Sequence, residues 1–258
     1  MIARRVKGGS GANGRLLLIA QPAHAALSGQ FARAWDFSAL PSVPEAARDA
    51  VGLGITLHDL SWIGFEAAPT LNPATGLPFL FREVPARLHT GRWAASVDQA
   101  GAFGAWPALL VSLQGVRIYE KFFPRARAAA EDAAAADAFL AHEHRRLPAL
   151  RAATGASDAA VAEADRLLGA CDWLSLLFCG DPMRSARVPD VPLPGGAGEI
   201  EVDLARGTIA PWPFAAPRVA FTCEARVLPE DTRFADEAAM RATLAAAPRE
   251  TLRWQMAR

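Results

Sequence analysis

The chain changes character late in its 258 residues. From about residue 22 to about residue 180, apolar residues recur at helical spacing, whereas residues 199–258 contain short strand-like stretches. Between them, residues 187–198 are rich in proline and glycine, which is typical of a connector made of turns. Helices that are segregated from strands in this way predict an α+β fold, in which a helical part packs against a sheet.

Two further strand-like stretches open the chain, at residues 1–7 and 15–20, around a glycine-rich loop. Gly9, Gly11 and Gly14 in this loop match the dinucleotide-binding pattern GxGxxG. That pattern acts by leading into a helix whose N-terminus holds the pyrophosphate, and here it leads into a strand. We therefore expect a β-hairpin here and no nucleotide site.

The spacing of apolar residues predicts five main helices before the connector. We expect them at residues 23–35, 45–65, 96–120, 125–154 and 157–180, with a long loop at 67–93 that forms a lid or a wall. The predicted fold is a mainly α single domain, residues 1–258. Its helical core spans about 22–186, and its small β layer comes from about 1–20 and 199–258.

Composition excludes several classes of protein. Hydrophobic residues make up 52% and charged residues 21%, as in ordinary globular proteins. The formal net charge of zero argues against nucleic-acid and membrane partners, and no apolar run approaches the roughly 18 residues of a membrane span. Three cysteines are too few for a disulfide framework. We expect a cytoplasmic protein with a small-molecule substrate, and leave a homodimer open.

Two imidazoles and two carboxylates stand out as candidate metal ligands: His24, the adjacent pair His58 and Asp59, and Asp172. Imidazole and carboxylate are the usual protein ligands of divalent first-row ions. Asp172 lies in an otherwise apolar helical segment, where a carboxylate is costly unless it is paired or bound to metal.

Ordinary structural roles are the alternative for the same residues. A histidine on an apolar helix face is commonly a hydrogen-bonded core residue. Asp172 could instead form a salt bridge, for example to Arg33 or Arg184, and Asp165 is a rival for the role of the late aspartate.

Five segments resemble an uncharacterised bacterial family, known only as domain-of-unknown-function family 3891, and more distantly the HD superfamily of metal-dependent hydrolases. The segments are residues 21–30, 57–62, 109–115, 171–176 and 212–214. The resemblance implies an HD-like helical bundle with a sheet attached, and no established activity. It also implies His24 as first ligand, His58 and Asp59 as the ligand doublet and Asp172 as last ligand. Gln114 departs from the family pattern, which tends to have histidine there.

These residues predict a metal-dependent hydrolase, acting on a phosphoester, whose ion could be Mn, Fe, Zn, Ni or Co. Glu66, two helical turns after His58, is the candidate catalytic base. Arg33 and Gln114 are candidate substrate-binding residues.

Two alternatives stay open. One is a non-catalytic small-molecule or protein-binding module with a vestigial metal site, which the Gln114 departure favours. The other is an HD-like iron oxygenase, which uses more histidines and could draw on His89, His142 and His144.

Overall fold

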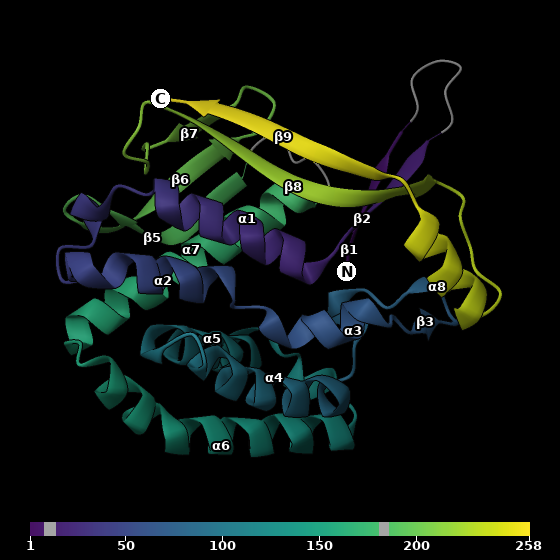
Figure 1. The fold of residues 1–258 in the computed structure, drawn as a ribbon, viewed down its shortest axis with the longest axis horizontal. Coiled ribbons are helices and arrows are strands. Elements are labelled where there is room, and N and C mark those ends of the chain that lie inside the picture. The colour runs from purple at the N-terminus through teal and green to yellow at the C-terminus, as the bar shows by residue number, and fades with distance from the viewer. Residues whose placement is uncertain (8–13, 181–185) are drawn as a thin grey trace.

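A computed structural model of the protein describes residues 1–7, 14–180 and 186–258. Its helices stack in layers beneath a seven-stranded sheet (Figure 1). The sheet order is β1-β2-β8-β9-β7-β6-β5. Its strands are β1 (Ile2–Val6), β2 (Arg15–Ile19), β5 (Ala186–Leu193), β6 (Gly196–Asp203), β7 (Thr208–Ala210), β8 (Arg218–Pro229) and β9 (Arg249–Ala257).

Both ends of the chain contribute to this sheet. β1 and β2 pair antiparallel, and β2 pairs antiparallel with β8, where Leu17 lies opposite Val227. Strands β7 and β9 pair in parallel, whereas the other neighbours are antiparallel. The loop that carries Gly9 and Gly11 lies outside the described residues, and β2 follows it as a strand.

The helices form successive layers away from the sheet. α1 and α7 pack against each other and contact β8 and β5, while α6 lies farthest from the sheet and contacts α4 and α5 (Figure 1). A small hairpin of β3 (Leu71–Asn72) and β4 (Leu77–Pro78) precedes α4. The helices are α1 (Gln21–Ala34), α2 (Arg48–Thr56), α3 (Ile63–Ala67), α4 (Ala86–Gly101), α5 (Ala105–Arg117), α6 (Ala130–Thr154), α7 (Asp158–Cys179) and α8 (Glu237–Ala246).

The packing of α1 holds together the part of the fold that carries the candidate ligands. Phe31 of α1 is fully buried and makes edge-to-face contacts with Phe178 of α7 and Phe221 of β8. On the opposite side, a Cβ on Gly29 would lie 2.0 Å from Thr56 Oγ1, so only glycine lets α1 approach the end of α2 this closely. His24 is thereby brought next to the turn that follows α2.

The prediction of an HD-like helical bundle with a small β layer is wrong, because the sheet has seven strands and spans the helical part. The error arises in the proline- and glycine-rich stretch, which forms most of β5 and the start of β6 rather than a connector. β5 is an edge strand with a register shift between Val188 and Val191, and edges and irregularities are where a sheet tolerates proline.

Two of the predicted helices are interrupted. The helix expected at 96–120 is two helices, α4 and α5, separated at Gly104, whose φ of 134° is not helical. α4 begins at Ala86, inside the predicted loop 67–93. The helix expected at 45–65 stops at Thr56, and a turn at residues 57–59 leads into a short 3₁₀ helix, Leu60–Trp62.

Among the described helices, none has the length and apolar character needed to cross a membrane.

Candidate metal centre and its cavity

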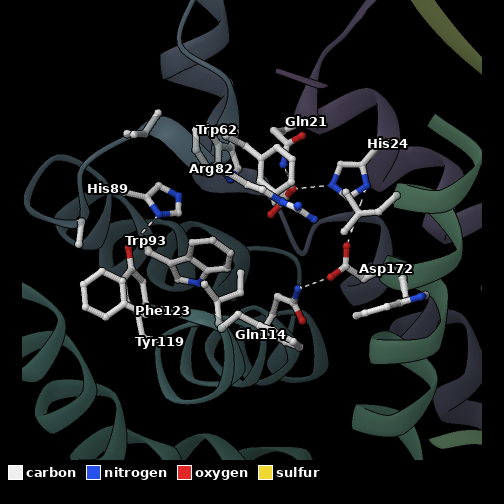
Figure 2. Close-up of a pocket in the computed structure, with 18 of the residues that line it drawn as sticks. Gln21, His24, Trp62, Arg82, His89, Trp93, Gln114, Tyr119, Phe123 and Asp172 are labelled. Atoms are coloured by element: carbon white, nitrogen blue, oxygen red, sulfur yellow. Dashed lines mark hydrogen bonds and ion pairs between the residues drawn. The ribbon is translucent and has the colours of Figure 1, made fainter. Parts of the chain in front are cut away.

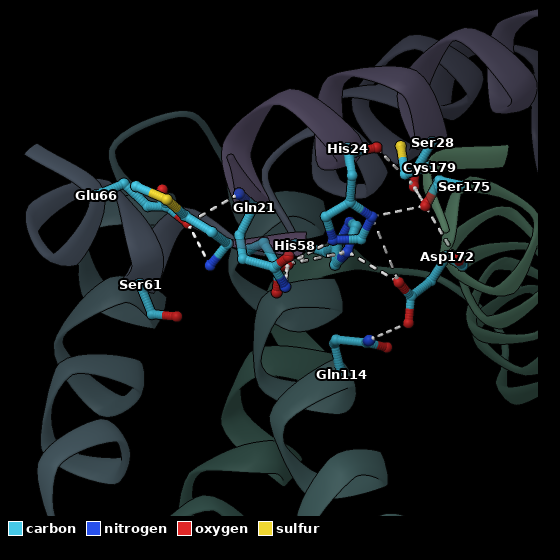
Figure 3. A network of polar contacts seen from close by, with 12 residues as sticks. Gln21, His24, Ser28, His58, Ser61, Glu66, Gln114, Asp172, Ser175 and Cys179 are labelled. Atoms are coloured by element: carbon cyan, nitrogen blue, oxygen red, sulfur yellow. Dashed lines mark hydrogen bonds and ion pairs between the residues drawn. The ribbon is translucent and has the colours of Figure 1, made fainter. Parts of the chain in front are cut away.

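The four candidate ligands come together below the N-terminal half of α1. His24 lies on α1, His58 and Asp59 lie in the turn after α2, and Asp172 lies on α7 (Figure 3). One ligand atom from each of His24, His58 and Asp59 can be chosen so that all lie within 4.8 Å of one another. The turn matters because it frees His58 and Asp59 from the 100° angle that separates neighbouring residues on a helix.

His58 presents an unpaired nitrogen to two carboxylates. Its Nδ1 donates to the Ile55 carbonyl at 2.8 Å, so in the neutral ring Nε2 carries the lone pair. Nε2 is buried without a hydrogen-bond partner among the described residues. It lies 3.8 Å from Asp59 Oδ2 and 3.4 Å from Asp172 Oδ1. A lone pair facing two carboxylates is unfavourable unless a proton or a cation lies between them.

His24 is held at both ring nitrogens. Nε2 lies 2.7 Å from Asp59 Oδ2, and Nδ1 lies 2.7 Å from Ser175 Oγ. Because the Ser175 hydroxyl donates to the Asp172 carbonyl at 2.8 Å, its oxygen can accept from His24 Nδ1. His24 Nε2 is then aimed at Asp59 and the space beside it.

The Asp172 carboxylate is oriented by the Gln114 amide, which is in turn oriented by Arg117. Gln114 Nε2 donates to Asp172 Oδ2 at 2.7 Å, and Arg117 donates to Gln114 Oε1 at 2.5 Å. Since the guanidinium can only donate, the Gln114 amide must turn its NH₂ group toward the carboxylate. The Asp172 side chain is 20% exposed, in contrast to His24 and His58, and forms the open side of the cluster.

The charges of the cluster are strongly coupled. Burial alone would lower the pKa of His58, but the Asp59 and Asp172 carboxylates outweigh it and raise the pKa from 6.5 to about 9. Burial alone would raise the pKa of Asp172, but contact with His58, the charge of His24 and the Gln114 hydrogen bond lower it to about 2. Without a cation, the charged form of His58 is therefore favoured and offsets part of the charge of the two carboxylates.

The same arrangement fits a divalent transition metal. Ligand atoms at about 2.0–2.2 Å from one ion lie at most about 4.4 Å apart, close to the spacing found here. The Nδ1 atoms of both histidines face oxygens, which is how ligating histidines are usually held in orientation. His24, His58 and Asp59 could together hold one ion, and Asp172 lies beside them with its Oδ1 3.4 Å from His58 Nε2.

Two other residues that the sequence suggested lie away from the cluster. Glu66 Oε1 accepts from the Gln21 backbone N–H at 3.1 Å and contacts the Met1 amino group at 2.8 Å, so it satisfies the first turn of α1. Glu66 does not line the cavity described below. Arg33 is exposed at the far end of α1 and does not line it either.

The rival aspartate Asp165 and the additional histidines His142 and His144 also lie away from the cluster. Asp165 lies two helical turns before Asp172 on α7 and pairs with Arg117. His142 and His144 are exposed on α6. Within residues 1–7, 14–180 and 186–258, a second group of metal-ligating side chains does not assemble. Arg184 lies outside the described residues.

A cavity of about 530 Å³ opens from the cluster, with Asp172 and Gln114 at one end and aromatic side chains at the other (Figure 2). Its size suits a small organic molecule. Its remaining polar lining residues are Gln21, Arg82, His89 and Tyr119. Its other aromatic lining residues are Trp62, Phe81, Trp93, Phe122, Phe123 and Trp173.

Sequence reasoning missed most of this lining. Gln21 donates to Asp59 Oδ2 at 3.1 Å, and only the fold brings them together. Tyr119 points inward from a turn of π-helix, Ile118–Phe122, that extends α5. Such turns are often found at functional sites but have no reliable sequence pattern. That Tyr119 is the only tyrosine of the chain was the available signal.

His89 is a histidine whose burial favours the neutral ring. Its Nδ1 lies 3.0 Å from the Tyr119 hydroxyl, and its Nε2 lies 3.4 Å from Ser61 Oγ. Burial lowers the pKa of His89 from 6.5 to about 4; the charge of Asp59 opposes this shift and that of Arg92 adds to it.

Stability is expected to fall between pH 6.5 and pH 4 because of His89. In this range the unfolded chain protonates His89 and the folded chain does not, so acid favours unfolding by roughly 3 kcal/mol over the window. His58 and Asp172 contribute little to this change. The pKa of His58 rises from 6.5 to about 9 on folding and that of Asp172 falls from 3.8 to about 2, so both effects lie largely outside this pH range. Urea unfolding at several pH values should show a steeper loss for the wild type than for His89→Gln. Parallel losses in both proteins would contradict the assignment.

Comparison with known proteins places the chain in a family. The family described as "protein of unknown function (DUF3891)" matches residues 9–230, and the chain belongs to it. No curated protein and no solved structure matches the chain.

Proposed function

We propose that this member of the DUF3891 family is a metal-dependent hydrolase that acts on a phosphoester. The observation that carries the proposal is the buried Nε2 of His58, which faces the Asp59 and Asp172 carboxylates with no hydrogen bond from the described residues. A structural histidine in a core is normally hydrogen-bonded at both ring nitrogens or exposed at one. A divalent cation would satisfy this nitrogen and both carboxylates at once.

The charges of the cavity support an anionic substrate. Two aspartates balance one divalent ion, which leaves Arg82 as the charged group that can attract a ligand. Arg82 lies beside the cavity and forms no ion pair with the carboxylates of the described residues (Figure 2). Guanidinium groups suit phosphate because they donate two parallel hydrogen bonds.

Hydrolysis would add one water across a P–O bond. The water oxygen bonds to phosphorus, the bond from phosphorus to the ester oxygen breaks, one water proton ends on the departing alcohol, and the other stays on the product phosphate until that group ionises. When bound, a divalent ion supplies a Lewis acid that lowers the pKa of water and polarises the phosphoryl group. Gln114 and Arg117 keep Asp172 in place, and Ser175 keeps His24 in place, so that the geometry is formed before substrate arrives.

The test is to measure metal and activity together. The protein is stripped with a chelator, loaded separately with Mn²⁺, Fe²⁺, Zn²⁺, Ni²⁺ or Co²⁺, and assayed by elemental analysis. Each form is then screened with generic phosphomonoesters and phosphodiesters. We expect one ion per chain, and ester hydrolysis that disappears with the chelator and returns with the ion. A chain that retains no ion in stoichiometric amount under any of these conditions would reject the proposal.

A further inference from the structure

The cavity beyond the candidate metal centre has two ends of different chemistry. In Figure 2, Gln21, Gln114 and Asp172 lie toward one end, whereas Trp93, Tyr119 and Phe123 lie toward the other. Its inner wall is rigid: Trp62 is 3% exposed, Trp93 is fully buried, and the His89 ring between them lies 4.3 Å and 5.0 Å from their rings. A rigid aromatic wall favours a flat ring over a flexible chain, because ring faces and edges attract each other.

Two exposed aromatic side chains, Phe122 and Trp173, also line the cavity. Phe122 is 57% exposed and Trp173 is 43% exposed, and their ring centroids lie 6.5 Å apart. Phe122 comes from the π-helical turn after α5, whereas Trp173 directly follows the candidate ligand Asp172 on α7. Single exposed apolar side chains are common, whereas adjacent exposed rings beside a cavity form a patch of the kind that serves binding. A ring held between the inner wall and this pair would cover them both.

Arg82 lies where the two ends meet. It belongs to the short 3₁₀ helix Phe81–Glu83, and its guanidinium carbon lies 5.2 Å from the centroid of the Phe81 ring. In Figure 2 its side chain extends over the cavity toward the end where His24 and Asp172 lie. Stacking on Phe81 holds the Arg82 side chain in position. Because Arg82 is exposed, its guanidinium group stays available to a ligand.

We propose that the ligand of this cavity is a phosphate ester of an aromatic-ring alcohol, with Arg82 on the phosphoryl oxygens and the ring between the inner aromatic wall and the Phe122–Trp173 pair. The identification of the ester rests on the proposed hydrolase function. The recognition of an aromatic ring and an anion rests on the cavity alone. Arg82 is a specificity-determining residue in this proposal, and it takes no part in the chemical step.

The experiment compares matched aromatic and saturated probes. Benzylphosphonate and cyclohexylmethylphosphonate have the same charge and number of carbons and cannot be hydrolysed at a P–O ester bond. Their binding is measured by calorimetry on the chain as purified and after loading with Mn²⁺. We expect benzylphosphonate to bind about tenfold more tightly, because ring–ring contacts are worth about 0.5–1.5 kcal/mol per pair and fewer form with cyclohexane.

Two variants and one control locate the contacts. Arg82→Gln is expected to weaken benzylphosphonate about 10- to 100-fold and to leave benzyl alcohol unaffected, since it removes a charge-assisted hydrogen bond. Trp173→Leu is expected to reduce the preference for the aromatic probe. Arg92→Gln is the control, because Arg92 is also exposed and also stacks on a phenylalanine, Phe65 at 4.9 Å, but does not line the cavity.

Turnover of benzyl phosphate and cyclohexylmethyl phosphate separates this inference from the proposed function. The two esters are matched in their chemistry because both release an alkyl alcohol, so a difference in their turnover reports recognition of the ring. Selective binding of benzylphosphonate without hydrolysis of either ester would support the ligand class and reject the hydrolase. Hydrolysis of both esters with equal kcat/KM, together with equal binding of both phosphonates, would support the hydrolase and overturn the ligand class. Binding that Arg82→Gln and Arg92→Gln weaken equally, or no phosphonate binding at all, would also overturn it.

Discussion

The variant His58→Gln is expected to lose stoichiometric metal and to lower phosphoesterase activity by more than about 100-fold, the upper range for losing a residue that merely orients a ligand. Glutamine has similar volume, so the buried position stays filled, but its amide is a poor ligand for a transition ion. The NH₂ group of the glutamine can still donate to the Ile55 carbonyl, to which His58 Nδ1 donates at 2.8 Å in the wild type. Elemental analysis and the activity screen measure both effects.

His142→Gln is the matched control for His58→Gln, because His142 is an exposed histidine on α6, away from the cluster. It should retain the wild-type ion content and activity. Thermal unfolding of both variants without added metal checks that the fold survives. If folded His58→Gln binds metal as the wild type does, His58 is a core histidine and the proposed centre is wrong.

The second large effect is expected for Asp172→Asn, which keeps the shape of the side chain and removes its charge. We expect metal affinity to fall about 10- to 100-fold or more and kcat/KM to fall further still, because Asp172 is both a candidate ligand and the part of the cluster that faces the cavity. Metal titration of the stripped variant measures the first effect. Steady-state kinetics at saturating metal measures the second.

Asp165→Asn tests whether these effects are specific to position 172. Asp165 lies two helical turns earlier on α7 and pairs with Arg117, the residue that orients Gln114. Its loss should leave metal affinity within a few-fold of wild type. Equal effects of the two substitutions would mean that Asp172 acts through the charge network of α7 instead of by ligation.

Local sequence patterns predicted several elements well and others poorly. The amphipathic stretches that became α1, α6 and α7 were placed within a few residues of their observed ends, since continuous apolar spacing and a Ser157 cap mark them. α4 was partly missed because turn residues dominate the stretch before it. β5 was missed because its prolines indicate a turn in most contexts, and only its place at the edge of the sheet permits them.

The candidate ligands were recognisable from residue type and surroundings, whereas the cavity was not. A histidine and an aspartate on apolar helical faces are unusual enough to be noticed in a sequence. Arg82 and Trp62 lie in short 3₁₀ helices without a distinctive sequence pattern, and they become lining residues only through packing. Glu66 and Arg33 show the opposite error, because helical spacing from a ligand does not say which way a side chain faces.

What the sequence by itself determined is therefore local: which stretches are amphipathic, and which buried positions carry an imidazole or a carboxylate. The tertiary structure decided everything that depends on distance between remote segments. His24, His58 and Asp172 meet because Gly29 lets α1 approach the end of α2, while Phe31 fastens the same helix to α7 and the sheet. Such contacts depend on the shapes of both partners at once, and periodicity along one segment carries no information about the other.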